Sequence, residues 1–315
     1  MGIDRTHILV LNYNTRALLA ECLPSIVAAA AESPVPCAVS VVDNGSTDDS
    51  LAYLTESWPT LGLIREPNRG LASFNHVLPG MDEPVVLLLN SDVKLDPGAV
   101  GPLLAGFQGR DDALFTAPLC WSFDGLEYEG MRTKVRSRYG LVQGMCRVPG
   151  HEAALGQPCL TAASGPVLAV DRQKFLDLGG YDPVYFPGRI EDLDLGFRGW
   201  MNGWKGYYVP ESVAYHQGFG SFAPAFGRSG CDRLAARNTL IFAWKNLSGP
   251  RLAAHLAWLP VRLVHSLATR RLAFVSAMVE ALALLAPVRA ERRKLAVGRV
   301  GWTVRQEAFF REFRW

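Results

Sequence analysis

Stretches of apolar residues alternate with polar loops along the first third of the chain. Five consecutive apolar residues at 85–89 are followed by Asn90, Ser91 and Asp92. An unbroken apolar run of this length is typical of a strand that is covered on both faces. Similar runs predict strands at 7–11, 38–42 and 61–66, and the segments between them predict helices at 16–31, 49–55 and 71–77. This alternation predicts parallel β-α-β units and an α/β fold.

Polar side chains follow each of these predicted strands. They are Asn12 and Asn14, Asp43 and Asn44, Asn68 beside Gly70, and Asn90 and Asp92. Because the carboxyl ends of parallel strands meet at one edge of a sheet, we expect these residues to line one crevice. A carboxylate in such a crevice can hold a divalent cation, which can hold a pyrophosphate. An Asx turn is the alternative at any single strand end, but four polar ends in succession favour a binding site.

Two glycine-rich nucleotide-binding motifs are missing from the sequence. A dinucleotide-binding fold carries GxGxxG after its first strand, but Asn12-Tyr13-Asn14 occupies that position. No P-loop sequence occurs in the chain. A nucleotide site in this protein must therefore use polar side chains at the strand ends together with a metal ion.

The middle of the chain predicts a second group of elements. A strand is expected at 163–170, and a short helix follows at 171–178 with Asp171 as its N-cap. Glu191 and Asp192 begin a further amphipathic helix that reaches residue 202. Acidic residues in a first helical turn are ordinary partners of the helix dipole. Their position alone therefore does not identify a catalytic base.

The segment from residue 121 to residue 159 is polar, rich in glycine and irregular in pattern. Basic residues occupy alternate positions within it, at Arg132, Lys134, Arg136 and Arg138. This spacing predicts one face of an edge strand. The alternative is that these side chains contact the phosphates of a lipid-linked acceptor.

Composition and charge narrow the class of protein. The length of 315 residues suggests about two domains, or one large domain with an appendage, and the 49% of hydrophobic residues support a packed core. The net charge is +2, but residues 251–315 carry twelve Arg or Lys against four Glu. An acidic body with a basic, aliphatic tail argues against nucleic-acid binding and fits a tail that meets an anionic membrane. The six cysteines show no metal-site spacing, and we expect free thiols.

Two aliphatic segments in the tail predict helices at 252–267 and 272–288. Pro260 is expected to kink the first, and the second is short for a membrane span and contains Glu280. Helices that lie in a membrane interface are therefore expected. Basic residues flank both segments: Arg262, Arg270, Arg271, Arg289, Arg292, Arg293 and Lys294. The alternative is that the apolar stripes pack on the rest of the chain or form a dimer interface.

In their order and spacing, these pieces resemble the family 2 inverting glycosyltransferases with the GT-A fold, within the rhamnosyltransferase-like branch. The matching segments of the first half are 10–14, 41–48, 68–70 with Asn75, and 88–92. Those of the second half are 164–165, 179–182, 191–198, and 209–211 with His216. The resemblance implies an α/β fold with a mostly parallel central sheet flanked by helices. It also implies a Rossmann-like nucleotide-sugar half (1–118), an acceptor half (119–245) and a helical C-terminal extension (246–315).

The resemblance also implies roles for individual residues. Asp43 accepts from the base of the nucleotide, and Arg69 is available to a phosphate. The residues implied at the nucleotide are Asn12, Tyr13, Asn14, Asp43, Asn44, Asn68, Arg69, Gly70, Asn75, Asn90 and Ser91. Asn90 replaces the first acid of the family's DXD-type motif, which leaves Asp92, with His216, to hold Mg²⁺ or Mn²⁺. Asp192 is implied as the general base, with Glu191 as the second candidate.

The implied function is transfer of a sugar, from dTDP-rhamnose or a UDP-sugar, to a glycan or lipid-linked acceptor in cell-surface polysaccharide synthesis. The basic tail predicts a peripheral location on the cytoplasmic face of the plasma membrane. A second copy of the chain, in a homodimer, is a further candidate partner. Two alternatives stay open. A non-catalytic GT-A relative that binds glycans or membranes is favoured by Asn90, and a metal-dependent nucleotidyltransferase is disfavoured by the missing phosphate loop.

Overall fold

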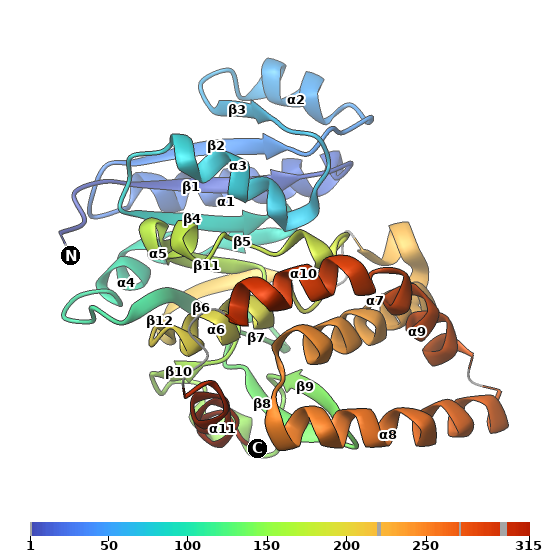
Figure 1. Cartoon of the computed structure of the whole chain (residues 1–315). Coiled ribbons are helices and arrows are strands. Elements are labelled where there is room, and N and C mark those ends of the chain that lie inside the picture. The colour runs from blue at the N-terminus through green and yellow to red at the C-terminus, as the bar shows by residue number, and fades with distance from the viewer. Residues whose placement is uncertain (1, 219–221, 271, 297–300) are drawn as a thin grey trace.

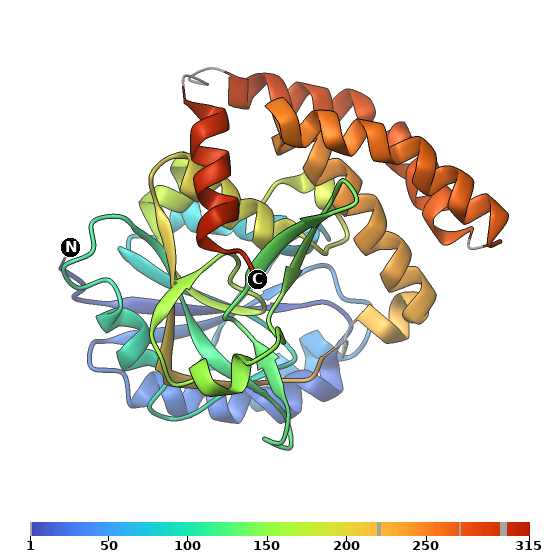
Figure 2. The same ribbon diagram turned by 90° about the horizontal axis from the view of Figure 1, so that it is seen from below.

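The computed structural model describes residues 2–218, 222–270, 272–296 and 301–315. A ten-stranded mixed sheet forms its centre, with the strand order β10-β12-β6-β11-β4-β1-β2-β3 (Figure 1). β5 and β7 extend this sheet through β12 and β6, and β8 and β9 form a separate two-stranded sheet. The C-terminal helices gather at the end of the molecule away from β3 (Figures 1 and 2).

The first half of the sheet is parallel, as the alternation of strands and helices predicts. Its elements are β1 (Thr6–Asn12), α1 (Arg16–Ala31), β2 (Cys37–Asp43), α2 (Ser50–Ser57), β3 (Gly62–Arg65) and β4 (Val85–Asn90). The apolar run of β4 is buried at all five positions, so both faces of this strand are covered. The carboxyl ends of β1, β2 and β4 point to the same edge (Figure 1), which places the predicted polar residues together.

The helix expected at 71–77 is instead a series of short turns. η1 (Gly70–Ser73), α3 (Phe74–Val77) and η2 (Leu78–Gly80) follow one another. The chain cannot continue as one α-helix because Pro79 lacks a backbone N–H and Gly70 adopts a positive φ of 59°.

The second half of the sheet is mixed. β11 (Val167–Asp171) runs antiparallel between β4 and β6 (Ala113–Ser122), and β12 (Lys205–His216) runs parallel to β6. β5 (Val93–Leu95) pairs with β12 in a register that sets Val93 opposite His216. This register brings the end of β4 next to the end of β12.

The strand expected at 163–170 begins four residues later, because Gly165 takes a positive φ of 65° and Pro166 follows it. α5 (Arg172–Asp177) has the predicted cap, since the Asp171 carboxylate accepts from the backbone N–H of Lys174 at 3.0 Å. The remaining short elements are α4 (Val100–Ala105), β7 (Tyr128–Gly130), β8 (Lys134–Arg138), β9 (Leu141–Met145), η3 (His151–Ala154), β10 (Cys159–Thr161) and η4 (Pro183–Tyr185). The edge strand predicted from the alternating basic residues is β8, which pairs with β9.

The C-terminal part is helical: α6 (Glu191–Met201), α7 (Phe222–Asn246), α8 (Gly249–Ala268), α9 (Ala273–Ala283), α10 (Leu285–Ala296) and α11 (Trp302–Glu312). The helix expected at 272–288 is two helices, α9 and α10, which are bent by 64° at Leu284. Within the described residues, no single helix is both long enough and apolar enough to span a membrane. Among these residues, only the bent pair of α9 and α10, taken together, has the length and composition of a span. Arg271, one of the predicted flanking residues, lies outside the described residues.

α11, which the sequence pattern did not predict, returns to the body of the protein. The backbone N–H of Val135 in β8 donates to the carbonyl of Phe313 at 2.7 Å. The ring of Phe309 contacts those of Phe197 and Trp200 of α6. The C-terminal residues therefore share a hydrophobic cluster with the helix that carries Asp192.

Candidate active site

The loops after β1 and β2 carry the first of the predicted nucleotide-binding residues. Asn12 and Asp43 are both buried, and the Asn12 amide donates to the Asp43 carboxylate at 2.9 Å. Asn14 has a positive φ of 52°, and its side-chain oxygen accepts from the backbone N–H of Thr47 at 2.7 Å. Tyr13 stands at the rim with 45% of its surface exposed. The two loops thus hold each other and leave an aromatic ring at the entrance.

The loop around Gly70 joins the turn after β2 to the segment around Pro187. The Asn44 amide donates to the carbonyl of Gly70 at 3.1 Å, and the backbone N–H of Gly70 donates to Asn68 at 3.1 Å. Gly70 has room for no side chain, because a Cβ would lie 2.9 Å from the carbonyl oxygen of Pro187. Arg69 forms an ion pair with Glu66 at 2.8 Å, so its guanidinium already has one anionic partner.

The side chain of Asn75 forms hydrogen bonds within the protein. Its amide donates to the carbonyl of Tyr181 at 2.7 Å and accepts from the backbone N–H of the same residue at 2.9 Å. Direct contact between Asn75 and a nucleotide stays a prediction, and its position supports the Gly180–Tyr181 turn.

The end of β4 supplies the predicted metal-binding residues. Ser91 shares a hydrogen bond with Thr15 at 2.7 Å, and Asp92 is only 3% exposed. The pairing of β5 with β12 sets Nε2 of His216 3.6 Å from Oδ1 of Asp92. The backbone N–H of Gln217 donates to the carbonyl of Asp92 at 3.0 Å, which fixes the two segments together.

This pair of side chains fits a divalent cation. Two ligand atoms that bind one ion at about 2.1 Å lie roughly 3–4 Å apart, which matches the 3.6 Å separation of Asp92 and His216. Among the residues that the structure describes, no three His, Cys, Asp or Glu side chains form a metal-site cluster. Oxygens of a donor diphosphate and water would therefore have to fill the other positions, as Mg²⁺ commonly accepts.

Glu129 of β7 is a residue that the sequence pattern did not reveal. Its Oε2 lies 3.8 Å from Nδ1 of His216, on the opposite side of the ring from Asp92. Contact with His216 lowers the pKa of Glu129, and Arg147 pairs with the same carboxylate at 3.0 Å. A carboxylate on the outer nitrogen of a metal-binding histidine fixes the ring and its tautomer. Glu129 lies in the segment that the sequence showed only as irregular, so no signal pointed to it.

Asp192 lies at the start of α6 and is held by backbone amides. Its carboxylate accepts from the N–H of Gly165 at 3.2 Å and from that of Leu193 at 2.8 Å. The same turn reaches the end of β4, where the N–H of Asn90 donates to the carbonyl of Pro166 at 3.1 Å. The turn at 164–166 therefore links the candidate base to the candidate metal site.

The two neighbouring carboxyls, Glu191 and Asp192, both have raised pKa values. Burial, followed by the charge of Asp192, raises the pKa of Glu191 to about 8. Burial also raises the pKa of Asp192, although its hydrogen bonds from the N–H groups of Leu193 and Gly165 oppose this. The pKa of about 8 favours the protonated form of Glu191 at neutral pH, whereas the two backbone N–H donors favour the carboxylate form of Asp192. The hydrogen bonds therefore make Asp192 the better candidate for the base.

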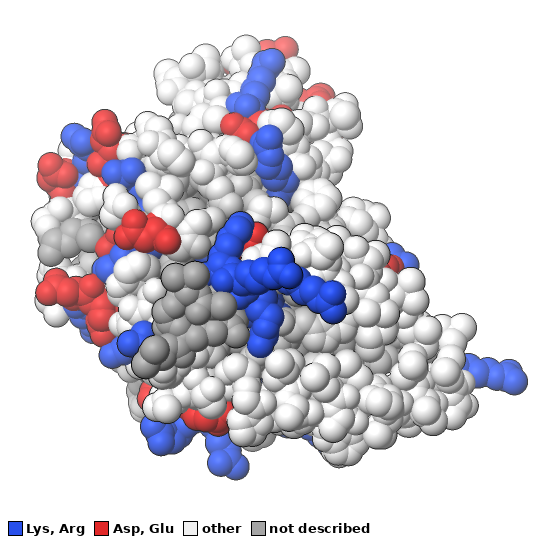
Figure 3. Space-filling model, in the orientation of Figure 1, with Lys and Arg blue, Asp and Glu red and all other residues white. Residues whose placement is uncertain are grey.

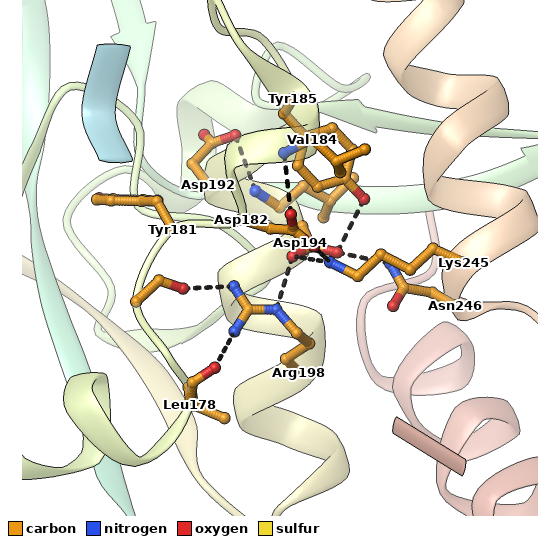
Figure 4. Close-up of polar contacts among 12 residues, drawn as sticks. Leu178, Tyr181, Asp182, Val184, Tyr185, Asp192, Asp194, Arg198, Lys245 and Asn246 are labelled. Atoms are coloured by element: carbon orange, nitrogen blue, oxygen red, sulfur yellow. Dashed lines mark hydrogen bonds and ion pairs between the residues drawn. The ribbon is translucent and has the colours of Figure 1, made fainter. Parts of the chain in front are cut away.

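A buried charge network anchors the helix that carries Asp192 (Figure 4). Asp194 is fully buried and accepts from Arg198 at 2.6 Å, Lys245 at 2.9 Å, Tyr185 at 2.9 Å and Asn246 at 2.6 Å. Burial alone would raise the pKa of Asp194, but the charges of Lys245 and Arg198 hold it below its ordinary value. The sequence marks Asp194 only as part of the resembling segment at 191–198.

The loop before α6 is strained and is held in place by α7. Arg189 and Ile190 adopt positive φ values of 80° and 75°, a conformation that is unfavourable for residues other than glycine. The Asn238 amide donates to the carbonyls of Gly188 and Arg189, both at 2.8 Å. Arg237 donates to the carbonyl of Phe186 at 2.5 Å. These contacts set the position at which α6 begins.

Together, the fold and the site define a class of enzyme. The strands of the parallel half end in polar side chains, the mixed half supplies the Asp192 carboxylate at a helix start, and the paired Asp92 and His216 could hold a cation. This is the arrangement of a GT-A glycosyltransferase.

Comparison with known proteins agrees with that class. Residues 7–154 match the model of glycosyl transferase family 2. The chain is 29% identical over 249 residues to the N-acetylglucosaminyl-diphospho-decaprenol L-rhamnosyltransferase of Mycobacterium tuberculosis, covering 68% of this chain and 76% of that protein. Both findings support a family 2 glycosyltransferase that is similar to the rhamnosyltransferases.

Solved structures show the same fold. A mannosyltransferase from Pyrobaculum calidifontis, in complex with GDP-Man and Mn²⁺, is 18% identical, with a TM-score of 0.53 over 99% of this chain and 86% of that chain. GalNAc-T7, with UDP, GalNAc and Mn²⁺, is 19% identical, with a TM-score of 0.53. This second comparison covers 68% of this chain and 43% of the longer protein. The likeness confirms the predicted GT-A fold with its C-terminal helices.

Proposed function

We propose that this enzyme transfers a sugar, with inversion, from a nucleoside-diphosphate donor to a lipid-linked glycan acceptor in cell-surface polysaccharide synthesis. The observation that carries the proposal is the turn at 164–166, which joins Asp192 to the end of β4. The name of the mycobacterial relative supports rhamnose as the sugar and a diphosphate lipid as the acceptor. We place the base of a dTDP or UDP donor at the loops that hold Asn12 and Asp43.

The proposed mechanism needs one base and no covalent intermediate. Asp192 accepts the proton of the acceptor hydroxyl as its oxygen attacks the anomeric carbon from the face opposite the diphosphate. Asp92 and His216 would hold a divalent cation, which neutralises the charge that develops on the leaving diphosphate. Glu129 keeps the ring of His216 in the orientation that this requires.

Transfer assays with separate donors test this proposal. Purified enzyme is incubated with dTDP-rhamnose or a UDP-sugar, a GlcNAc-diphosphate-polyprenol acceptor, and Mg²⁺, Mn²⁺ or EDTA. We expect a product in which the anomeric configuration is inverted, formed with one donor in preference and lost in EDTA. Retention of configuration, or equal turnover in EDTA, would contradict the mechanism.

We further propose that the enzyme lies on the inner face of the plasma membrane. Large apolar side chains of α8 are exposed, at Leu256, Trp258, Val261, Val264 and Leu267. Figure 3 shows little charge over this helix, and the basic residues Arg251 and Arg262 lie within it. An exposed apolar helix face with basic neighbours is typical of a protein that lies in a membrane interface.

A further inference from the structure

A cavity that contains none of the candidate active-site residues lies where three segments distant in the sequence meet. It has a volume of about 600 Å³, and its walls come from β8, the start of α8 and the end of α11. Figure 2 shows the C-terminus beside the β8–β9 hairpin. Neither Asp92 nor Asp192 lines this cavity. The proposed mechanism therefore gives it no role.

The charge of the cavity is strongly positive. Five arginines line it against a single acid, Glu307, and they are Arg136, Arg138, Arg251, Arg311 and Arg314. Glu307 is fully engaged, because Arg251 binds both of its oxygens at 2.7 Å. The other four cations repel one another at short range unless an anion joins them.

Aromatic rings hold two of these arginines in place. The guanidinium of Arg136 lies 3.8 Å from the centre of the Trp315 ring, and that of Arg251 lies 3.8 Å from the centre of the Phe310 ring. Stacking fixes the plane of a guanidinium, whose fork of donors matches a phosphate. The buried indole N–H of Trp315 has no acceptor among the described residues and would supply one more donor.

The apolar face of α8 starts at this cavity and indicates the kind of anion. Arg251 lies in the first turn of the helix, and the exposed side chains from Leu256 to Leu267 follow it. No acidic residue occurs in α8. A free phosphate or a nucleotide makes no use of such a face, whereas a lipid presents an anionic headgroup next to acyl chains.

We propose that the arginine cavity, defined by these five arginines with Trp315, binds the phosphate of an anionic phospholipid while the exposed face of α8 enters the acyl region. The site rests on the proposed membrane location, and it makes that location specific for anionic lipid. It also explains why the alternating basic residues of β8 occur on an edge strand: two of them, Arg136 and Arg138, line the cavity.

The test compares two matched pairs of arginine substitutions. Arg311→Gln with Arg314→Gln removes two exposed cavity cations, and Arg289→Gln with Arg293→Gln removes two exposed cations of α10. Sedimentation with phosphatidylglycerol vesicles and phosphatidylcholine vesicles at 0.1 M salt gives the partition coefficients. At about 1 kcal/mol per basic residue, the cavity pair loses about 30-fold in binding to phosphatidylglycerol, and the α10 pair loses less than about 3-fold. We expect wild-type protein to bind phosphatidylcholine vesicles weakly, and equal binding to both kinds of vesicle would contradict the specificity for anionic lipid.

Several outcomes would overturn the proposal. Equal losses for the two pairs would show a diffuse surface charge rather than a site, and unchanged binding of the cavity pair would remove the site altogether. Calorimetric binding of inorganic phosphate without vesicle binding would show a free-anion site. A dimer in light scattering that the α8 substitution Val264→Ser dissolves would show a second copy on this face. Because vesicle binding needs no turnover, failure here is distinct from failure of the transfer assay.

Discussion

Replacement of Asp194 by Asn tests the charge network that supports the active-site helix. The Asp194 carboxylate is fully buried and is the shared anion of Arg198 and Lys245. In the variant Lys245 still pairs with the carboxylate of Asp182, and Arg198 still donates to the carbonyls of Leu178 and Gly180, but both lose the shared anion. Removal of one partner from a buried ion pair costs about 3–5 kcal/mol. Because Asn retains the shape and one acceptor oxygen, we expect a loss of about 3 kcal/mol in the free energy of unfolding.

Urea unfolding followed by circular dichroism measures this loss. The pKa of Asp194 lies below its ordinary value, so the residue is ionised throughout pH 5–8 and the loss should be constant over that range. Asp177→Asn on α5 is the matched control, since Asp177 is exposed and, among the described residues, accepts a hydrogen bond only from Gln173, at 2.8 Å. We expect the control to change stability by less than about 0.5 kcal/mol. A loss below about 1 kcal/mol in Asp194→Asn would refute the stabilising role of the network.

Three further predictions concern residues around the site. The pKa of Glu191 is raised to about 8 in the folded state, so the folded protein holds a proton that the unfolded chain releases near pH 4.5. The stability of the wild type should therefore fall relative to that of Glu191→Gln as the pH rises from 5 to 8. A stability difference that stays constant over this range in urea titrations would contradict this. Glu129→Gln should weaken Mn²⁺ binding in the presence of UDP by about 10-fold or more in calorimetry, because His216 loses its orienting carboxylate; equal affinity would exclude that role. Gly165→Ala should lower stability by about 1–3 kcal/mol and reduce turnover, because a Cβ at this positive-φ position would lie 2.3 Å from Sδ of Met131 and displace the backbone N–H that holds Asp192; unchanged melting and turnover would argue against this packing.

The sequence predicts the parallel half of the fold well because its signals are local. The apolar run 85–89 is long enough to identify a buried strand, and the helix at 16–31 has the same bounds in the structure. The strand at 163–170 was predicted too long, because the backbone turn at Gly165 is set by tertiary contact with Asp192. The split of 272–288 into two helices likewise depends on packing, which periodicity does not record.

Within the candidate site, the predictable residues are those that end a strand or begin a helix. Asp92 and Asp192 occupy such positions, and the resemblance to the family adds His216. Glu129 lies on a three-residue strand, and only the pairing of β7 with β6 brings it near the ring of His216. Its contact is between segments distant in sequence, so a single sequence carries no signal for it.

The most direct test of the account is the Asp192→Asn variant in the transfer assay, with donor binding measured in parallel by calorimetry. The account predicts that transfer falls by about 10²–10⁴-fold, the usual contribution of a general base, while binding of the nucleotide donor stays within about 3-fold of wild type. Glu191→Gln, in which the neighbouring proton carrier is lost, should retain more activity than Asp192→Asn. Near-normal transfer by Asp192→Asn would contradict the assignment of the base and, with it, the proposed mechanism.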